Sequence, residues 1–410
     1  MRAIKFITTI VLLALSLFAS SQEELNQYLQ IAAENNPGLK AKFNNYLASL
    51  EKVPQVSALP DPQVSFGYFI QPVETRTGPQ QFRISVNQVF PWFGSQGAKG
   101  DLATQSAKTQ FEVFQETKAK LFDEVRSAYY NLYFTRKAMA ILDENIEILE
   151  SFEKLALVKV EAGKVSAVDE FRIQMDLNDL QNQQLLLADN FMVQAVQFQN
   201  LVNDTINRPL MLPDNLWETG FELNKTQLLD SIQTLNHQLL QIDYEKELLV
   251  LKKEVDKLED RPGFSVGIDY INIGNGDNNL SGKDAFVFPK IGFSIPIFRK
   301  KYHAMVKEVA LLESVKDFEK QDKNNWLENI FEISYKNYND ADRRLELFRT
   351  QSELAEKSLK ILETEYATSN LNFEELLRME RQLLKYDLEL EKAKADKQAA
   401  VSFINYLMGK

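Results

Sequence analysis

The sequence of 410 residues contains no cysteine. This absence excludes disulfide bonds, thiolate metal sites, cysteine-held iron–sulfur clusters and thiol catalysis. It also removes the residue to which a lipid is attached in a lipoprotein. Histidine is scarce: neither His237 nor His303 lies near another metal-ligand type in a recognisable spacing. Packed or solvated histidines are therefore a simpler interpretation than metal ligands.

Long apolar runs are lacking as well. No segment beyond the N-terminus approaches the 18 consecutive apolar residues expected of a transmembrane helix. The N-terminus combines the basic residues Arg2 and Lys5, a mostly apolar run over 6–18 and small residues at 19–21. This pattern predicts a signal peptide over residues 1–21 and export of the remainder. A membrane anchor is the alternative, but the run is short for a span and no basic flank follows it.

Patterns for nucleic-acid binding and for catalysis are missing. The 47 basic and 58 acidic residues give a formal charge of −11, which disfavours nucleic acid as a partner. Gly263–Gly267 reads G-x-S-x-G, but a nucleophilic serine needs a sharp strand-to-helix turn, and here an apolar alternation runs straight through Ser265. The glycines of 274–282 fit neither the dinucleotide nor the phosphate-loop spacing. The sequence predicts no enzyme, no cofactor and no metal site.

Glycine and proline are absent from long segments, which predicts long helices. One such segment covers 101–162, Gly163 interrupts it, and a second covers 164–208. In the second half, the segment 297–408 lacks both residues over 112 positions. Because that is too long for one helix of a compact domain, each half is predicted to form two antiparallel helices joined by a tight turn. The turns are expected near 162–168 and 368–373.

Two stretches with a period of two precede the long helices of the first half. Side chains of a strand point alternately to its two faces, so each stretch has one apolar face and one small or polar face. A β-hairpin is therefore predicted within 62–93, with its loop at 71–81. Its apolar positions are Val64, Phe66, Tyr68, Ile70, Phe82, Ile84 and Val86.

The second half repeats this order of elements at an offset of 200 residues. Asn36 precedes Pro62 by 26 positions, and Asn236 precedes Pro262 by the same interval. PGFSVG from Pro262 matches PQVSFG from Pro62, although Pro289 is awkward inside the last predicted strand. The apolar positions of this second β-hairpin are Phe264, Val266, Ile268, Tyr270, Val287, Ile291, Phe293 and Ile295.

The repetition predicts a duplicated chain, each half consisting of a helix, a β-hairpin and a helical hairpin. A linker rich in proline separates the halves. The predicted division is a signal peptide over 1–21, a first repeat over 22–208 with its β-hairpin at 62–93, a linker over 209–226, and a second repeat over 227–410 with its β-hairpin at 262–298.

Four strands cannot close a barrel, because both edge strands keep unpaired backbone groups. In hydrocarbon each such group costs several kcal/mol, so an open sheet is not viable there. Three copies would supply twelve strands around a polar, water-filled lumen. We therefore expect an α+β membrane protein whose four strands per chain enter a trimeric twelve-stranded β-barrel, with the charged helices forming a long α-helical barrel in the periplasm. A soluble sandwich with a free-standing coiled coil is the alternative.

Aromatic residues gather near the predicted strand ends, as they do in the interfacial belts of membrane proteins. An ordinary aromatic core is the alternative interpretation. The belt candidates are Phe69, Phe90, Trp92, Phe93, Phe286, Phe288 and Phe298.

Several motifs give the chain a likeness to a known family. They are Asn35-Asn36-Pro37, LPDPQVSFGY at Leu59–Tyr68, FPWFG at Phe90–Gly94 and EAGKVSAVDEF at Glu161–Phe171. Together with the duplicated order of elements, they resemble the TolC family of trimeric outer-membrane efflux proteins over essentially the whole mature length. PDPQ followed by FPWFG looks most like the branch paired with heavy-metal and cation efflux pumps.

The resemblance implies a homotrimer in the outer membrane, with a helical tunnel that is closed at its periplasmic end at rest. It implies opening when a periplasmic adaptor (a membrane fusion protein) and an inner-membrane pump of the RND type engage the tunnel. The adaptor would dock at the turns of the helical hairpins. These tip residues are Ala162, Gly163, Lys164, Val165, Ser166, Thr368, Ser369, Asn370, Leu371 and Asn372.

The resemblance also places acidic residues at the closed end, where they would hold the turns together or line the entrance. This sequence departs from the family pattern, with Leu371 where an arginine tie is expected and Arg378 where an acidic residue is expected. A contact between Arg378 and one of the acidic residues of the first turn is one alternative, and solvated helix-end charges are another. The gate candidates are Asp169, Glu170, Glu374, Glu375 and Arg378.

The predicted function is passive conduction by the outer-membrane exit channel of a tripartite efflux system. Metal cations or small toxic molecules are the expected cargo. An exit channel for a type I protein-secretion system is an alternative of the same class. A soluble periplasmic coiled-coil adaptor is an alternative of a different class, and the duplication argues against it.

Overall fold

The computed structural model describes residues 22–162, 166–204, 206, 208–275, 282–368 and 373–410. The predicted signal peptide lies outside these residues. Tertiary contacts divide the chain into two compact units, each built from both repeats. The hairpin unit consists of Met1–Ala41, Gln115–His237 and Asn324–Lys410, and the sheet unit of Lys42–Phe114 and Gln238–Lys323.

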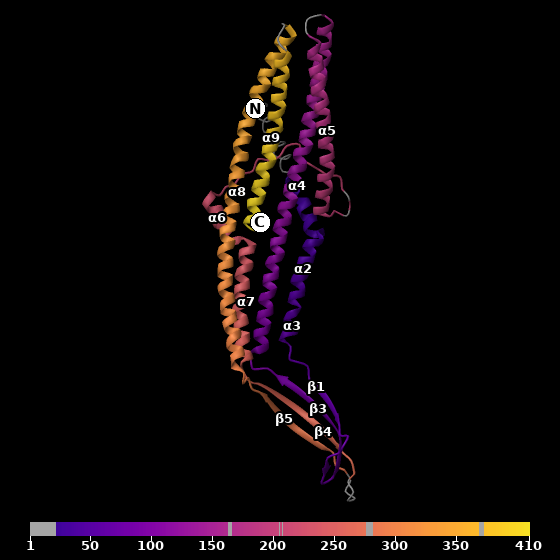
Figure 1. Ribbon diagram of the computed structural model, residues 1–410, viewed down its shortest axis with the longest axis vertical. Helices are drawn as coiled ribbons and strands as arrows, with labels where there is room; N and C mark the ends of the chain where they lie inside the picture. Colours follow the sequence, from indigo (N-terminus) through magenta and orange to yellow (C-terminus); the bar gives the residue numbers. More distant parts are fainter. Residues whose placement is uncertain (1–21, 163–165, 205, 207, 276–281, 369–372) are drawn as a thin grey trace, which may run out of the picture. The chain divides into compact units, whose positions relative to one another are not determined.

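Helices make up most of both units (Figure 1). The first helix covers residues 22–35, and a break at Asn36, just before Pro37, separates it from α2. The longest helix, α8, has 70 residues, which corresponds to about 105 Å at 1.5 Å per residue. The helices after the first are α2 (Pro37–Leu50), α3 (Lys52–Ser57), α4 (Ser95–Glu161), α5 (Ala167–Val202), α6 (Lys225–Leu235), α7 (His237–Glu259), α8 (Arg299–Thr368) and α9 (Phe373–Leu407).

One antiparallel sheet contains all the described strands. Its order is β1-β3-β4-β5, with β2 attached to β3, so the two predicted β-hairpins join through the β3–β4 pair. In that pair Val86 lies opposite Ile268 and Ser85 opposite Asp269, which keeps apolar and polar positions on separate faces. The predicted order of helix, two strands and helical hairpin in each half is confirmed. The strands are β1 (Gln63–Tyr68), β2 (Glu74–Thr75), β3 (Gly78–Phe90), β4 (Gly263–Ile273) and β5 (Ala285–Ser294).

Two details of the strand prediction are wrong. The first strand ends at Tyr68, so β1 has six residues and Ile70 lies outside it, although the alternation placed Ile70 in the strand. On β5, Val287 lies opposite Asp269 on the polar face, although the alternation assigned it to the apolar face. The register shifts between Gly267 and Asp269, where β5 carries one additional residue. An inserted residue of this kind reverses the faces of the positions beyond it.

An asparagine fastens the end of each helical hairpin to the first helix of the same half. The Asn36 side chain donates to the carbonyl of Leu201 at 3.0 Å, and the Asn236 side chain donates to the carbonyl of Leu407 at 2.9 Å. Both acceptors lie in the last turn of a helix, where carbonyl groups lack helical partners. Asn36 and Asn236, which are 200 residues apart, therefore make equivalent hydrogen bonds in the two halves.

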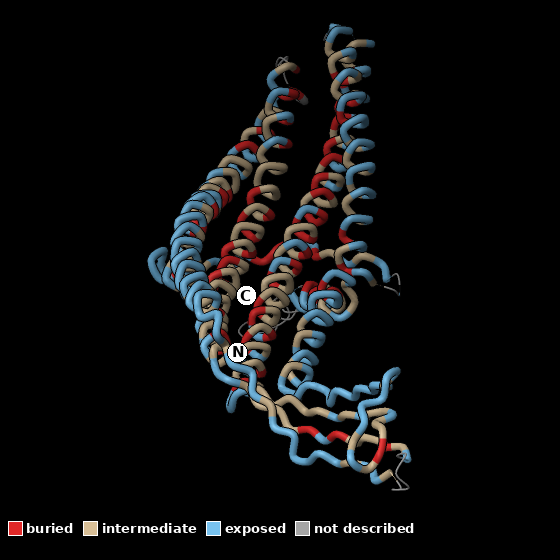
Figure 2. Tube along the Cα trace, turned by 60° about the horizontal axis from the view of Figure 1, so that its bottom comes forward, coloured by how far each residue is buried: buried red, intermediate tan, exposed pale blue. Residues whose placement is uncertain are grey.

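The hairpin unit has an apolar core to which all four long helices contribute. On α4, buried positions recur at spacings of three, four and seven, which places them on one face. Near the turns, the ring of Phe373 packs 6.3 Å from Phe152 and 5.0 Å from Tyr366, so α9 contacts both α4 and α8 there. Figure 2 shows buried positions in red along the long helices. The core residues are Leu142, Leu149, Phe152, Ala156, Ile173, Leu177, Leu180, Leu359, Tyr366, Phe373, Leu376, Leu377 and Leu384.

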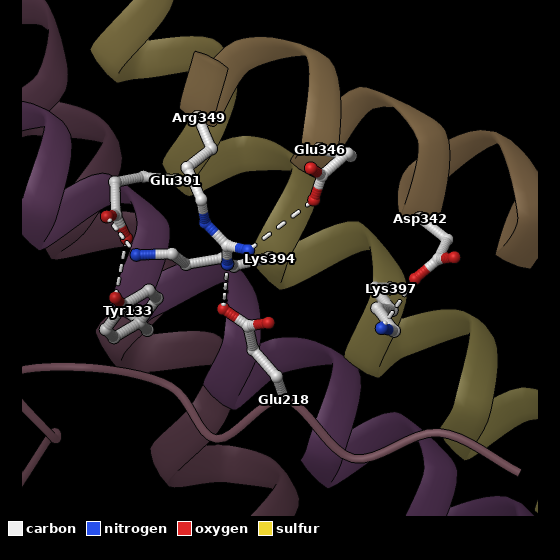
Figure 3. Close-up of polar contacts among 8 residues, drawn as sticks. All are labelled: Tyr133, Glu218, Asp342, Glu346, Arg349, Glu391, Lys394 and Lys397. Carbon is white, nitrogen blue, oxygen red and sulfur yellow. Dashed lines mark hydrogen bonds and ion pairs between the residues drawn. The ribbon is translucent and has the colours of Figure 1, made fainter. Parts of the chain in front are cut away.

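The segment between the repeats is extended and is fixed to the helices of the hairpin unit. Trp217 is 9% exposed, and Glu218 forms an ion pair with Arg349 of α8 at 2.7 Å (Figure 3). The next residue, Thr219, donates from its hydroxyl to Gln398 of α9 at 3.0 Å. The described part of the predicted linker, up to the start of α6, thus contributes contacts to the unit.

Replacing Asn236 tests whether the repeated asparagine contact stabilises the fold. Asn236 is 1% exposed, and Asn236→Ala leaves the Leu407 carbonyl without this partner. The free energy of unfolding is expected to fall by about 1–3 kcal/mol. Urea unfolding of the purified chain measures it. The control is Asn45→Ala at an exposed position of α2, where a change within about 0.5 kcal/mol is expected. Equal effects of the two substitutions would contradict the assignment.

Candidate functional site

One face of the sheet exposes large apolar side chains. Val64, Phe66 and Tyr68 on β1 are 70%, 67% and 69% exposed, and Phe286 and Phe293 on β5 are 69% and 73% exposed. Contiguous exposure of this kind marks a surface that an apolar partner or a lipid phase covers. None of the described helices has the length and apolar content needed to cross a membrane.

Two rows of aromatic rings bound this apolar face. The distal row runs across all four strands as Phe66, Phe82, Tyr270 and Phe286, with ring centroids 5.8, 6.0 and 5.1 Å apart. Such spacings are typical of interacting aromatic pairs.

The helix-side row lies at the opposite end of the strands, where α4 begins. Phe264 stacks on Phe90 at 5.2 Å and contacts Phe93 at 5.8 Å, and Phe93 contacts Trp92 at 6.0 Å. From Phe82 to Phe90 the rise along β3 is about 26 Å at 3.3 Å per residue. A tilt of roughly 40° reduces this to about 20 Å, near the apolar band of about 25 Å in outer-membrane proteins.

The rows contain four of the seven predicted belt residues, namely Phe90, Trp92, Phe93 and Phe286. Of the other three, Phe288 and Phe298 are 70% and 77% exposed, and Phe69 is half-buried just beyond β1. Four further row members were not among the predicted belt residues, although the sequence places them at apolar positions of the strands. These are Phe66, Phe82, Phe264 and Tyr270.

The sheet has two open edges among the described residues. β1 pairs only with β3, and β5 pairs only with β4. β1 is exposed at all six positions and β5 at most of its ten. A row of free backbone donors and acceptors beside an apolar face is a template for further strands.

A second candidate site lies at the turns of the helical hairpins. Ala162 follows α4, Ser166 caps α5 by accepting from the amide of Val168 at 3.2 Å, and Thr368 ends α8. The remaining predicted tip residues lie outside the described residues: Gly163, Lys164, Val165, Ser369, Asn370, Leu371 and Asn372.

Two ion pairs join the helical hairpin of the first half to that of the second half. Arg172 of α5 contacts Glu374 of α9 at 2.8 Å, and Arg381 of α9 contacts Asp176 of α5 at 2.9 Å. Arg172 also contacts Asp169 at 3.5 Å, so two gate candidates, Asp169 and Glu374, meet on the same guanidinium group. Pairs as exposed as these contribute about 0.2–1 kcal/mol each.

The other gate candidates make local contacts within the chain. Arg378 pairs with Glu375 at 3.6 Å along α9, not with Asp169 or Glu170, and Glu170 accepts from Gln174 at 3.5 Å. The two cations that bridge the hairpins, Arg172 and Arg381, were not among the predicted gate residues. A signal for them was available, because positions 169, 172 and 176 share one helix face, as do 374 and 381, with opposite charges alternating.

Glu380 is a buried carboxyl group two turns into α9. The residue is 2% exposed, and its Oε2 atom has no hydrogen-bond partner among the described residues. Burial, and to a smaller extent the charges of Glu363 on α8, Asp387 on α9 and Glu144 on α4, raise the pKa of Glu380 to about 7. The described residues contain no arrangement of acidic or histidine side chains suited to a metal ion. With a pKa of about 7, this carboxyl group gains and loses a proton close to neutral pH.

Glu380→Gln tests the coupling between this proton and stability. A carboxyl group whose folded pKa lies above its unfolded value of 4.5 gives stability that is complete below pH 4.5 and is lost as the pH rises through about 7. The wild-type chain should therefore be up to about 3 kcal/mol less stable at pH 8 than at pH 4.5 on account of this group. Thermal unfolding at several pH values should show a flatter profile for Glu380→Gln.

The matched control for this test is Glu353→Gln, at an exposed position of α8. It should leave the pH profile of the wild-type chain unchanged. A profile for Glu380→Gln that parallels the wild type between pH 4.5 and pH 8 would contradict the assignment.

Comparison with known proteins gives structural matches. No family model matches the sequence, and no curated protein does. The chain is similar to the outer membrane protein VceC from Vibrio cholerae, with 12% identity, a TM-score of 0.76 and coverage of 96% of this chain and 98% of that chain. It is also similar to the MtrE outer membrane channel of Neisseria gonorrhoeae in its open state, with 13% identity, a TM-score of 0.74 and coverage of 94% and 89%. At such identities the likeness establishes the fold, which is that of the TolC-type outer-membrane channels.

Proposed function

We propose that the chain is the outer-membrane exit channel of a tripartite efflux system and conducts its cargo passively. The observation that carries this proposal is an exposed apolar sheet face that lies between two aromatic rows and ends at two open edges. A lipid bilayer covers such a face, and its interfacial regions suit the rings. A soluble adaptor would leave the same face in water, which disfavours that alternative.

The open edges require further strands once the face lies in lipid. An unpaired backbone group in hydrocarbon costs several kcal/mol, and both β1 and β5 would expose a row of them. In a homotrimer, β5 of one copy pairs with β1 of the next, and twelve strands close without an edge. The polar faces of the strands then line a water-filled lumen.

The long helices continue from the strands and carry charge on their outer faces, so they belong in the periplasm. We assign the signal peptide to 1–21, the repeats to 22–208 and 227–410, and the linker to 209–226. The structurally similar proteins include the CmeC outer membrane channel of Campylobacter jejuni. This likeness supports the same location for this chain.

The turns of the helical hairpins are proposed as the periplasmic gate and the docking site of the adaptor. The Arg172–Glu374 and Arg381–Asp176 pairs would hold the two hairpins of each chain together at rest. An adaptor bound at the tips Ala162–Ser166 and 368–372 would separate them, with an inner-membrane pump of the RND type supplying the energy. Metal cations or small toxic molecules remain the proposed cargo, and the heavy-metal branch remains a proposal from the sequence motifs.

Cysteine cross-linking tests the trimer and its closure. The sequence has no native cysteine, so every cross-link observed must come from the introduced cysteine pair. Gln63→Cys on β1 and Ser65→Cys on β1 are each combined with Ser294→Cys on β5, at the helix-side end of both edge strands. A short bismaleimide applied to outer-membrane vesicles should give covalent trimers on a denaturing gel.

The control pair joins Gln63→Cys with Glu353→Cys on the exposed side of α8, and it should remain monomeric. Monomers for both β1–β5 pairs, together with recovery of the chain in the soluble fraction after cell breakage, would overturn the proposed function.

Removing the cross-hairpin cations tests the gate. The double variant Arg172→Ala/Arg381→Ala deletes both ion pairs between α5 and α9. In a planar lipid bilayer its resting conductance is expected to rise several-fold, because the hairpins lose about 0.4–2 kcal/mol of mutual attraction per chain. Asp169→Ala should cause a smaller rise, since Asp169 acts through Arg172.

Arg343→Ala on α8 is the control, because Arg343 is 72% exposed and pairs only locally with Asp340 at 3.5 Å. A resting conductance of the double variant equal to that of this control would show that the two pairs do not hold the gate.

A further inference from the structure

Three charged residues stand alone in the long strands of the sheet. β1 has none, β3 has Arg83, β4 has Asp269 and β5 has Lys290. They come from three neighbouring strands and meet at one place. The sheet therefore concentrates all the charge of these four strands in a single cluster, the Arg83–Asp269–Lys290 cluster.

The contacts within the cluster neutralise the carboxylate of Asp269, while the side chains of Arg83 and Lys290 stay partly exposed. Arg83 donates to Oδ2 of Asp269, and Lys290 donates to Oδ1 at 3.3 Å, so each carboxylate oxygen has its own cation. The Asp269 side chain is 2% exposed, whereas those of Arg83 and Lys290 are 41% and 45% exposed. The surface that a passing molecule meets is therefore cationic, with a formal surplus of one positive charge per chain.

Two glycines adjoin the cluster on the polar face, and two apolar residues, Ile271 opposite Arg83 and Val287 opposite Asp269, also lie beside it. Gly67 lies opposite Arg83, and Gly267 lies opposite Lys290. A Cβ atom at Gly267 would stand 2.7 Å from the carbonyl oxygen of Val86, so this position admits no larger residue without displacing β3. At the two glycines, no side chain stands beside the guanidinium group of Arg83 or the ammonium group of Lys290.

We propose that the Arg83–Asp269–Lys290 cluster is the charge-selecting element of the lumen and favours anionic over cationic solutes. This inference rests on the proposed function, because the polar face lines a lumen only in the closed trimer. Three copies place three clusters on one ring with a surplus of three positive charges. A field of this kind acts on ions within about 8 Å at physiological ionic strength. The cargo that the strands admit most readily is a small anionic or zwitterionic molecule, and free metal cations are disfavoured at this level.

Reversal potentials in a planar lipid bilayer under a tenfold gradient of potassium chloride test the proposal. Asp269→Asn removes the negative charge and should raise the chloride-to-potassium permeability ratio by about two- to threefold. Lys290→Gln removes a positive charge and should lower the same ratio by a similar factor. The helices also contain charged residues that affect the wild-type permeability ratio. The test therefore compares the ratio of each variant with that of the wild type.

Arg343→Gln on α8 removes a positive charge outside the strands and is the matched control, with an unchanged ratio expected. Each variant is first checked for assembly by the β1–β5 cross-link. If Asp269→Asn fails to assemble, Lys290→Gln decides alone. If Lys290→Gln conducts normally but leaves the chloride-to-potassium permeability ratio unchanged or raises it, the proposed selectivity is wrong. The proposed function as a channel would be unaffected by that result. Absence of conductance in the assembled chain even when the gate pairs are removed by Arg172→Ala/Arg381→Ala overturns the proposed function itself.

Discussion

Backbone hydrogen bonding at the edges of the sheet is the constraint on which the rest of the structure depends. β1 and β5 each have one strand partner in the described chain, and the face between them is apolar. In water this arrangement would aggregate, and in lipid it would be unstable unless other strands complete it. The long helices, the duplication and the aromatic rows all fit a sheet that several copies share.

Much of this architecture could be predicted from the sequence because its signals are local and repeated. The alternation at Val64, Phe66 and Tyr68 identifies a two-faced strand, and the lack of glycine and proline over 297–408 identifies long helices. Asn36 and Asn236 mark equivalent positions in the two halves, and each makes an equivalent contact. The strands and helices depend on residues that are close together in the chain, and the asparagine contacts depend on the repetition of one half by the other.

The parts that could not be predicted depend on pairing between distant segments. Val287 changes face because β5 has one more residue than the facing part of β4, and alternation within one strand does not reveal that difference. Arg172 is one charge among many on a polar helix, and its partner Glu374 lies about 200 residues away in the chain. Glu380 follows a common helical pattern of acidic residues, and its burial arises from the packing of the long helices of the hairpin unit around α9.

The duplication has a consequence for symmetry. Each half contributes two main strands, so six unfused halves or three fused chains reach the same twelve strands. Fusion lets the halves diverge: β4 and β5 carry Asp269 and Lys290, while β1 has no charge and β3 has Arg83 alone. A ring assembled from identical halves would repeat every side chain six times. In the proposed trimer of fused chains, each residue occurs three times around the barrel axis. Oppositely charged groups from the two halves can therefore alternate around one end of the barrel.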